Sequence, residues 1–373
     1  MEEIFQSSSF TLDSSSISES SNPYGFSRSE SSKTVGESSI FWVTNTNDSG
    51  EGSLREAVQM ANDSAGYDIV MLSNDLENAI RLNTEIVITD DVTIEGNGNK
   101  IRGSGEDRLF RIDDGDLGTW SKVEIHDLLL TGGVANGNEA AEAAGGAIYS
   151  AEVLTLDEVI VRKNFASRFG AGIFNFQGHL TVKNSVIARN DDIAAQDDTF
   201  YGIYGGGIYN YRGTLNLIDT TIRKHDIERC GGGVFNEAGV VFMERTTIRN
   251  NAALHGGAIL NLNAVTFLNE TALVKNTARE LGGGIANFAT KEPFAGPFGR
   301  TEAGGELESV APSVLYMDSD SVIRQNTAFD FGGGIFNGDD GGFFTEGVLI
   351  GVEEGINVLR NKEEDIFGPT QTL

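Results

Sequence analysis

A repeat of about 25 residues, running from residue 145 toward the end of the chain, limits the possible folds more than any other feature. Each unit contains short β-branched runs and turn residues but no helical segment. Such a length holds three strands of the usual ~5–6 residues with three turns. This pattern predicts a parallel β-helix with one coil per repeat. The units open Gly-Gly/Ala-Gly/Ala-Ile/Val, with spacings of 25, 35, 26, 25, 26 and 50 residues, at Gly145, Gly170, Gly205, Gly231, Gly256, Gly282 and Gly332.

Two kinds of recurring residue are expected to form ladders, because stacked strands place equivalent residues ~4.8 Å apart. A position that is always aliphatic is expected to fill the interior: Ile148, Ile173, Ile208, Val234, Ile259, Ile285 and Ile335. Asparagine recurs at two other positions, and one side-chain amide can donate to the oxygen of the next. We interpret these asparagines as structural: Asn175, Asn210, Asn236, Asn261, Asn287 and Asn337, then Asn164, Asn190, Asn251, Asn276, Asn326 and Asn361, with His225 replacing one.

Two intervals exceed the period, and each predicts an insertion. The 35-residue interval adds about ten residues near 191–204, and the 50-residue interval adds a loop at 289–313 rather than another coil. The β-helix is expected to span residues 69–368, with a C-terminal tail at 369–373. Insertions in solenoids often lie on one face and shape a ligand groove.

The region before the repeats, residues 41–68, is expected to cap the solenoid. Ser53 and Glu56 form a capping box at the start of a short helix. One apolar stripe can cover the open first coil, formed by Leu54, Ala57, Val58 and Ala61. Residues 1–40 contain 15 serines and little apolar periodicity, so we expect a disordered tail.

Composition excludes several classes of protein. The 55 acidic and 27 basic residues give a net charge of −28, which argues against a nucleic-acid partner. Proline is scarce, at 5 residues against 47 glycines, so Pro-rich disorder and collagen are excluded. The single cysteine, Cys230, excludes a disulfide scaffold, and no apolar run reaches the ~18 residues of a membrane span. The first residues also lack the pattern of a secretory signal.

The repeats resemble those of polymorphic outer-membrane proteins, whose Gly-Gly-Ala-Ile and Phe-x-x-Asn units build a right-handed parallel β-helix. In this chain the asparagine directly follows the Ile-aromatic pair, which departs from the strict pattern. Residues 43–48 and 53–57 are similar to a leader with Ser-Leu-Arg-Glu-Ala, and Gly52 stands where some members carry Cys. The resemblance implies a pectin-lyase-like fold and an extracellular or cell-surface location. It implies no single activity, because that superfamily includes lyases, hydrolases and adhesins.

A row of basic residues precedes the second recurrent asparagine. Arginine pairs with carboxylates through two hydrogen bonds, so this row is a candidate site for a polyanionic sugar chain. The candidate ligand-binding residues are Arg162, Arg189, Arg223, Arg249 and Arg324. The alternative is local neutralisation by an acidic row upstream, formed by Glu158, Asp219, Glu270 and Asp320.

The first insertion contains four aspartates within eight residues, which is a candidate calcium site because Ca²⁺ binds 6–8 oxygen atoms. No Asp-x-Asp-x-Asp-Gly order is present, so a solvated acidic loop is the alternative. The candidate metal ligands are Asp191, Asp192, Asp197 and Asp198. An aromatic row beside the interior position is either a sugar-stacking strip or core: Tyr149, Phe174, Tyr209, Phe235 and Phe336.

Two functions of different classes follow. The uniform repeats and the absence of a singular catalytic constellation favour a surface or matrix β-helix, adhesin-like or glycan-binding. The alternative is a pectate-lyase-like polysaccharide lyase or hydrolase, assisted by calcium and cleaving beside the two insertions. No other cofactor is expected. Convergence of acids with Arg223 in a groove would favour the enzyme, and scattered solvated side chains would favour the rod.

Overall fold

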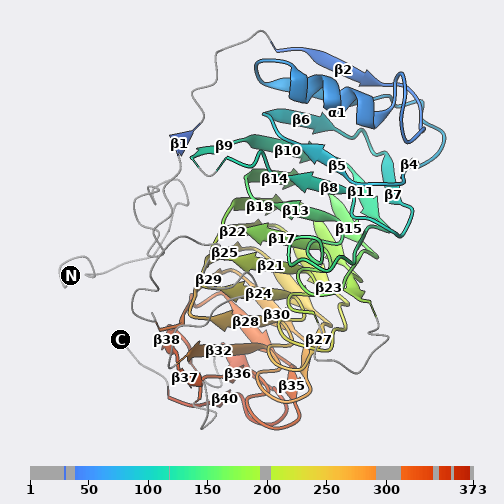
Figure 1. Cartoon of the computed structure of the whole chain (residues 1–373). Helices are drawn as coiled ribbons and strands as arrows, with labels where there is room; N and C mark the ends of the chain where they lie inside the picture. The colour runs from blue at the N-terminus through green and yellow to red at the C-terminus, as the bar shows by residue number, and fades with distance from the viewer. Residues whose placement is uncertain are drawn as a thin grey trace.

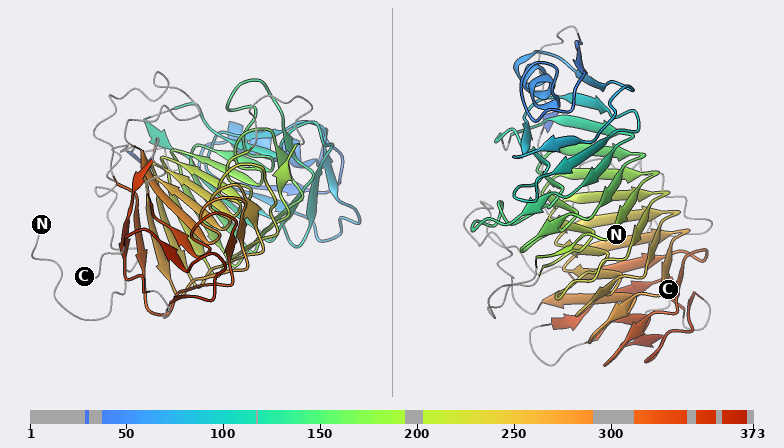
Figure 2. Two further views of the ribbon diagram at one scale, coloured as in Figure 1. Left: turned by 90° about the horizontal axis from the view of Figure 1, so that it is seen from below. Right: turned by 90° about the vertical axis from the view of Figure 1, so that its right-hand side faces the viewer.

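A computed structural model describes residues 29–30, 38–116, 118–193, 203–290, 312–338, 344–353 and 357–369. In these residues the chain forms a right-handed parallel β-helix, in which each coil contributes one strand to each of three long sheets (Figure 1). Figure 2 shows the strands of successive coils lying behind one another along the solenoid axis. The sequence-based prediction of the fold is therefore confirmed.

Three sheets, called here sheets 1, 2 and 3 in the order in which each coil visits them, make up the walls. Sheet 1 consists of β2 (Ile40–Val43), β3 (Asp68–Leu72), β6 (Val92–Glu95), β10 (Lys122–His126), β14 (Val153–Asp157), β18 (His179–Lys183), β22 (Thr214–Ile218), β25 (Val240–Glu244), β29 (Val265–Asn269), β33 (Val314–Met317) and β38 (Val348–Ile350). Sheet 2 consists of β4 (Ile80–Leu82), β7 (Lys100–Gly103), β11 (Leu129–Thr131), β15 (Ile160–Arg162), β19 (Val186–Ala188), β23 (Thr221–Arg223), β26 (Thr247–Arg249), β30 (Ala272–Val274), β34 (Val322–Arg324) and β39 (Val358–Leu359).

Sheet 3 closes each coil. It consists of β5 (Ile86–Ile88), β8 (Phe110–Ile112), β13 (Ile148–Ser150), β17 (Ile173–Phe176), β21 (Ile208–Tyr211), β24 (Val234–Glu237), β28 (Ile259–Leu262), β32 (Ile285–Thr290), β36 (Ile335–Phe336) and β40 (Ile366–Phe367), with β37 (Phe344–Glu346) antiparallel to β32. Shorter strands lie between sheets 2 and 3: β12 (Val134–Ala135), β16 (Phe165–Ala166), β20 (Asp191–Asp192), β27 (Ala252–Ala253), β31 (Thr277–Ala278) and β35 (Thr327–Ala328).

The interior row predicted from the sequence is confirmed. Ile173 pairs with Ile208 across the 35-residue interval, and Ile285 pairs with Ile335 across the 50-residue interval. Each long interval is therefore one coil with an insertion, as predicted. Residues 194–202 and 291–311 of these insertions lie outside the described residues. Every member of the row is fully buried: Ile148, Ile173, Ile208, Val234, Ile259, Ile285 and Ile335.

Two asparagine ladders bind the coils together, as the sequence predicts. The ladder beside sheet 3 runs from Asn175 to Asn337, and each Nδ2 donates to the Oδ1 of the next coil at 2.7 to 3.0 Å. The second ladder follows sheet 2, from Asn164 to Asn361, and is interrupted at His225. The backbone N–H of Asn190 donates to His225 Nδ1 at 3.1 Å, so the imidazole keeps the coils connected.

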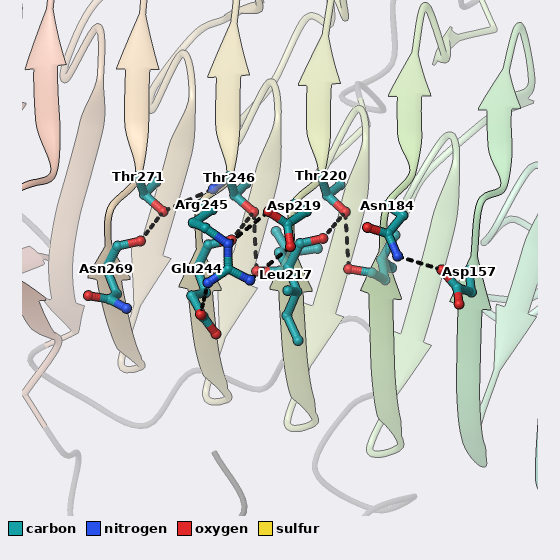
Figure 3. Close-up of polar contacts among 12 residues, drawn as sticks. Asp157, Asn184, Leu217, Asp219, Thr220, Glu244, Arg245, Thr246, Asn269 and Thr271 are labelled. Carbon is teal, nitrogen blue, oxygen red and sulfur yellow. Dashed lines mark hydrogen bonds and ion pairs between the residues drawn. The ribbon is translucent and has the colours of Figure 1, made fainter. Parts of the chain in front are cut away.

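A third polar ladder, which the sequence did not reveal, lies at the corner between sheets 1 and 2 (Figure 3). Thr220, Thr246 and Thr271 are buried, and each Oγ1 donates to the backbone carbonyl two residues earlier at 2.9 to 3.1 Å. Ser185 and Ser321 occupy the same position in other coils. Hydroxyls replace amides here because a local carbonyl lies within reach of the short side chain.

The N-terminal cap contains α1 (Leu54–Asp63), which packs against β2, β3 and β5. Ser53 Oγ accepts from the backbone N–H of Glu56, and the Glu56 carboxylate accepts from Gly52 N–H, so the predicted capping pair forms with a one-residue shift. The predicted apolar stripe is buried: Leu54, Ala57, Val58 and Ala61. Within the range predicted as a tail, β1 (Ser29–Glu30) pairs with β9 (Thr119–Trp120). Residues 1–28 and 31–37 lie outside the described part of the chain.

Candidate functional site

The outer face of sheet 2 carries a line of arginines, called here the strand row. Consecutive register pairs align them across the sheet, each directly after a buried aliphatic residue such as Val161 or Ile248. Because neighbouring residues of a strand point to opposite faces, the arginines project outward. The strand row consists of Arg81, Arg102, Arg162, Arg223, Arg249 and Arg324, and the other coils have Thr131, Ala188, Val274 and Leu359 at this position.

A second line of cations, called the turn row, follows the strand row by one residue. These residues turn the chain out of sheet 2 in the left-handed conformation, with φ between 54° and 61°. The turn row consists of Lys163, Arg189, Lys224, Lys275 and Arg360, all exposed. The sequence grouped Arg189 with the strand arginines, but the register gives that position to Ala188. Arg189 therefore belongs to the turn row.

The two rows complement one another, and together they are called the basic track. Where the strand row lacks a cation, the turn row supplies one, as Arg189 does beside Ala188 and Lys275 beside Val274. Where the turn row has Asn250 or Gln325, the strand row has an arginine. Every coil from β15 to β39 consequently presents at least one cation. At ~4.8 Å per coil, this spans about 29 Å.

The basic track has no carboxylate partner within ion-pair distance in the described part of the chain. The acidic row that the sequence offered as its neutralising partner lies at the opposite edge of sheet 2. There Asp219 is bound by Arg245 through two hydrogen bonds of 2.8 Å, and Glu244 binds the same arginine (Figure 3). Asp219 is thus paired within its own corner, and no ion pair connects Asp219 with Arg223.

Two of the four aspartates of the first insertion lie in the described part of the chain, shortly after Arg189 of the basic track. Asp191 and Asp192 form β20, whereas Asp197 and Asp198 lie outside the described residues. Burial, together with the negative charge of Asp192 and then of Asp226, raises the pKa of Asp191 to about 7. Asp226 is itself bound by Arg279 at 2.6 Å. Among the described residues no three acidic, histidine or cysteine side chains gather to hold a metal ion, and the calcium site stays a prediction.

The aromatic row beside the interior position is core rather than an exposed strip. Tyr149, Phe174, Tyr209, Phe235 and Phe336 are each at most 4% exposed and pack on one another over the outer face of sheet 3. A different aromatic ladder, missed from the sequence, lies on the outer face of sheet 1. It consists of Phe242, Phe267 and Tyr316, whose rings stack nearly parallel with centroids 4.6 to 4.9 Å apart. The stacked rings cover the faces of one another against which a sugar would pack.

A buried carboxyl interrupts the aromatic layer of sheet 3. Glu237 accepts a hydrogen bond from the Tyr209 hydroxyl, and burial raises the pKa of Glu237 to about 7. Cys230 lies beside His255 of the next coil, and His255 Nε2 lies 3.4 Å from Glu280. Burial raises the pKa of the Cys230 thiol to about 12, which disfavours its thiolate form.

Two arginines at the N-terminal end of the basic track were not predicted from the sequence. Arg81 and Arg102 precede the region where the glycine-initiated repeat is visible. Each follows an isoleucine, as Arg223, Arg249 and Arg324 also do, so the aliphatic-arginine pair is the signal that could have identified them.

Comparison with protein-family models gives no match for this chain, and comparison with curated protein sequences gives none. The structure supports the parallel β-helix, while the resemblance of the leader and repeats to polymorphic outer-membrane proteins stays a prediction. In the described part of the chain, no helix is long and apolar enough to cross a bilayer.

Proposed function

We propose that this protein is a surface or matrix β-helix that binds a linear polyanionic glycan along the basic track. The observation that carries the proposal is the complementarity of the two rows, which maintains one cation per coil from β15 to β39. A coil rise of ~4.8 Å spaces these cations evenly along the solenoid axis. A polyanion that extends along this axis therefore meets one cation per coil.

The electrostatics of the track support an external partner. Two unit charges ~4 Å apart in water repel by about 1 kcal/mol, so a ladder of like charges destabilises the free protein. Arg162 and Lys163, like Arg223 and Lys224, even place two cations in one coil. A bound polyanion offsets this repulsion. A net charge of −28 repels polyanions at long range, so affinity has to come from close contact with the track.

The test compares two double variants by calorimetry against a polyuronate, a sulfated glycan, a neutral glycan and duplex DNA. In Arg223→Gln/Arg249→Gln we expect affinity for the acidic glycans to fall roughly tenfold. The matched control, Lys122→Gln/Lys183→Gln, removes the same charge from the outer face of sheet 1 and should bind within about twofold. Equal losses in both variants, or no acidic glycan bound, would contradict the proposal. Tighter binding of DNA than of either glycan would contradict the assignment to glycans.

A second candidate function, cleavage of the same glycan, is favoured by Asp191. A carboxyl with a pKa of about 7, two residues after Arg189, has the properties of a general acid or base near neutral pH. Incubation with a polyuronate, in calcium and in chelator, followed by assays for unsaturated and reducing-end products, tests this function. Products that disappear in Asp191→Asn would support cleavage. If no products form under either condition, cleavage is refuted and binding is the one function that remains proposed.

A further inference from the structure

The two edges of sheet 2 carry opposite charges. The basic track follows one edge, and an acidic line, called here the acidic corner, follows the other. Its residues precede the strands of sheet 2 by two positions and are exposed: Asp127, Glu158, Asp219, Glu270 and Asp320. Asp219 is bound by Arg245, whereas the other four have no ion-pair partner among the described residues.

The acidic corner cannot reach the basic track of its own molecule. Glu158 and Arg162 are four residues apart along extended chain, which corresponds to about 13 Å at ~3.3 Å per residue. The outward residues between them are aliphatic or threonine, and Ile160 is 39% exposed. Sheet 2 therefore presents three parallel lines to solvent, which are acidic, weakly polar and basic.

We propose that sheet 2 is a self-complementary surface, and that two copies of this chain associate face to face about a two-fold axis parallel to the solenoid axis. This rotation exchanges the two edges of sheet 2 but keeps each coil at the same position along the solenoid axis, called here its height. The acidic corner of one copy then faces the basic track of the other, in both directions at once. A two-fold axis across the solenoid would instead place acid on acid, so the charges select one orientation.

The coils match individually at both ends of the track. Glu158 lies at the height of Arg162, Glu270 at that of Lys275, and Asp320 at that of Arg324. In the middle coils the acidic corner is uncharged or already paired, at Asn184 and at the Asp219–Arg245 bridge. The contact face of about 29 by 13 Å is below the ~800 Å² per partner of a standard interface, so we expect weak, salt-sensitive association.

This surface also regulates the proposed glycan site, a point that rests on the proposed function. At both ends of the track the carboxylates of the acidic corner lie at the height of the cations, and so they occupy some of the cations that a polyanionic chain would bind. A bound glycan and a second copy consequently exclude one another. Self-association itself does not depend on the glycan.

Sedimentation velocity of the full chain tests the surface. At about 0.1 M salt, where the Debye length is roughly 10 Å, we expect a concentration-dependent dimer, and at about 1 M salt a monomer. Glu270→Lys and Lys275→Glu should each weaken the dimer at least tenfold, and the double variant should restore it. The control variants Glu51→Lys and Lys122→Glu, away from sheet 2, should leave it unchanged. A monomer at every concentration in low salt, or a double variant that does not restore the dimer, would overturn the inference.

The two proposals fail separately. Glu270→Lys should lose self-association while keeping its affinity for polyuronate within about twofold, and polyuronate should dissociate the dimer of the unaltered chain. A chain that dimerises through these pairs but binds no polyanion refutes the glycan site alone. A chain that binds polyuronate but never dimerises refutes the self-complementary surface alone.

Discussion

The asparagine ladders and the basic track each repeat one kind of side chain along the solenoid, an amide in the ladders and a cation in the track, yet their energetics are opposite. Each buried asparagine donates to its copy in the next coil, so repetition satisfies the polar groups within the chain. Each cation of the basic track repels the cation of the next coil, so repetition leaves the track unsatisfied. Repetition that pairs with itself indicates a structural role, and repetition that repels itself indicates a partner outside the chain.

The largest expected effect comes from breaking a complete ladder. Asn236 accepts from Asn210 and donates to Asn261 and Gly239, all buried. Asn236→Ala removes these three buried hydrogen bonds, each with a net contribution of ~0.5–1.5 kcal/mol, and leaves a cavity, so we expect stability to fall by about 4 kcal/mol. Chemical denaturation measures the change. The control, Asn216→Ala on the outer face of sheet 1, should cost less than about 1 kcal/mol, and equal costs would contradict the structural role.

His225 interrupts the asparagine ladder that follows sheet 2, and replacing it by asparagine tests whether the ladder stabilises the fold. Burial lowers the pKa of His225 to about 4, so the folded chain holds this imidazole neutral while the unfolded chain binds a proton below pH ~6.5. Stability contributed by neutral His225 is present above pH ~6.5 and is lost as the pH falls toward 4. We expect His225→Asn to gain about 3 kcal/mol relative to the unaltered chain at about pH 4, measured by urea denaturation. A constant difference between pH 7 and pH 4 would contradict this.

Glu237 makes stability depend on pH in the opposite sense. A buried carboxyl is neutral when protonated, whereas a buried imidazole is neutral when deprotonated. Its raised pKa means that the folded chain retains a proton that the unfolded chain releases above pH ~4.5. Stability is therefore greatest in acid and is lost as the pH rises through about 7. Replacing Glu237 by Gln should remove this loss, leaving the variant roughly 3 kcal/mol more stable near pH 8. Thermal denaturation across this range checks the sign.

The smallest effect is expected on the basic track. Arg249→Gln removes a charge that repels its neighbours and has no described ion-pair partner, so we expect stability to stay within about 0.5 kcal/mol or to rise slightly at low salt. Differential scanning calorimetry at two salt concentrations measures this. A loss above about 1 kcal/mol would show that the track is held by contacts within the chain.

The local sequence pattern was sufficient to predict the coils, but not to predict how side chains of successive coils are arranged on the surface. The interior aliphatic row and both asparagine ladders could be predicted because they recur with the repeat, and both insertions because they lengthen an interval of it. The threonine ladder was missed because its position holds threonine or serine in some coils and leucine or valine in others. The five candidate arginines all lie on the basic track, but the sequence assigned Arg189 to the strand row rather than to the turn row, and their role in binding stays a prediction.

The repeat alone establishes that the chain winds once per unit, because a residue's own copy in the next coil is its nearest neighbour in a stacked sheet. Which charges meet depends on the register and packing of the folded chain. Register placed Ala188 where an arginine was expected, brought Arg81 and Arg102 into line, and separated the acidic corner from the basic track across sheet 2. Interactions between charges depend on distance in space, which a one-residue shift of register or a left-handed turn changes without altering the period.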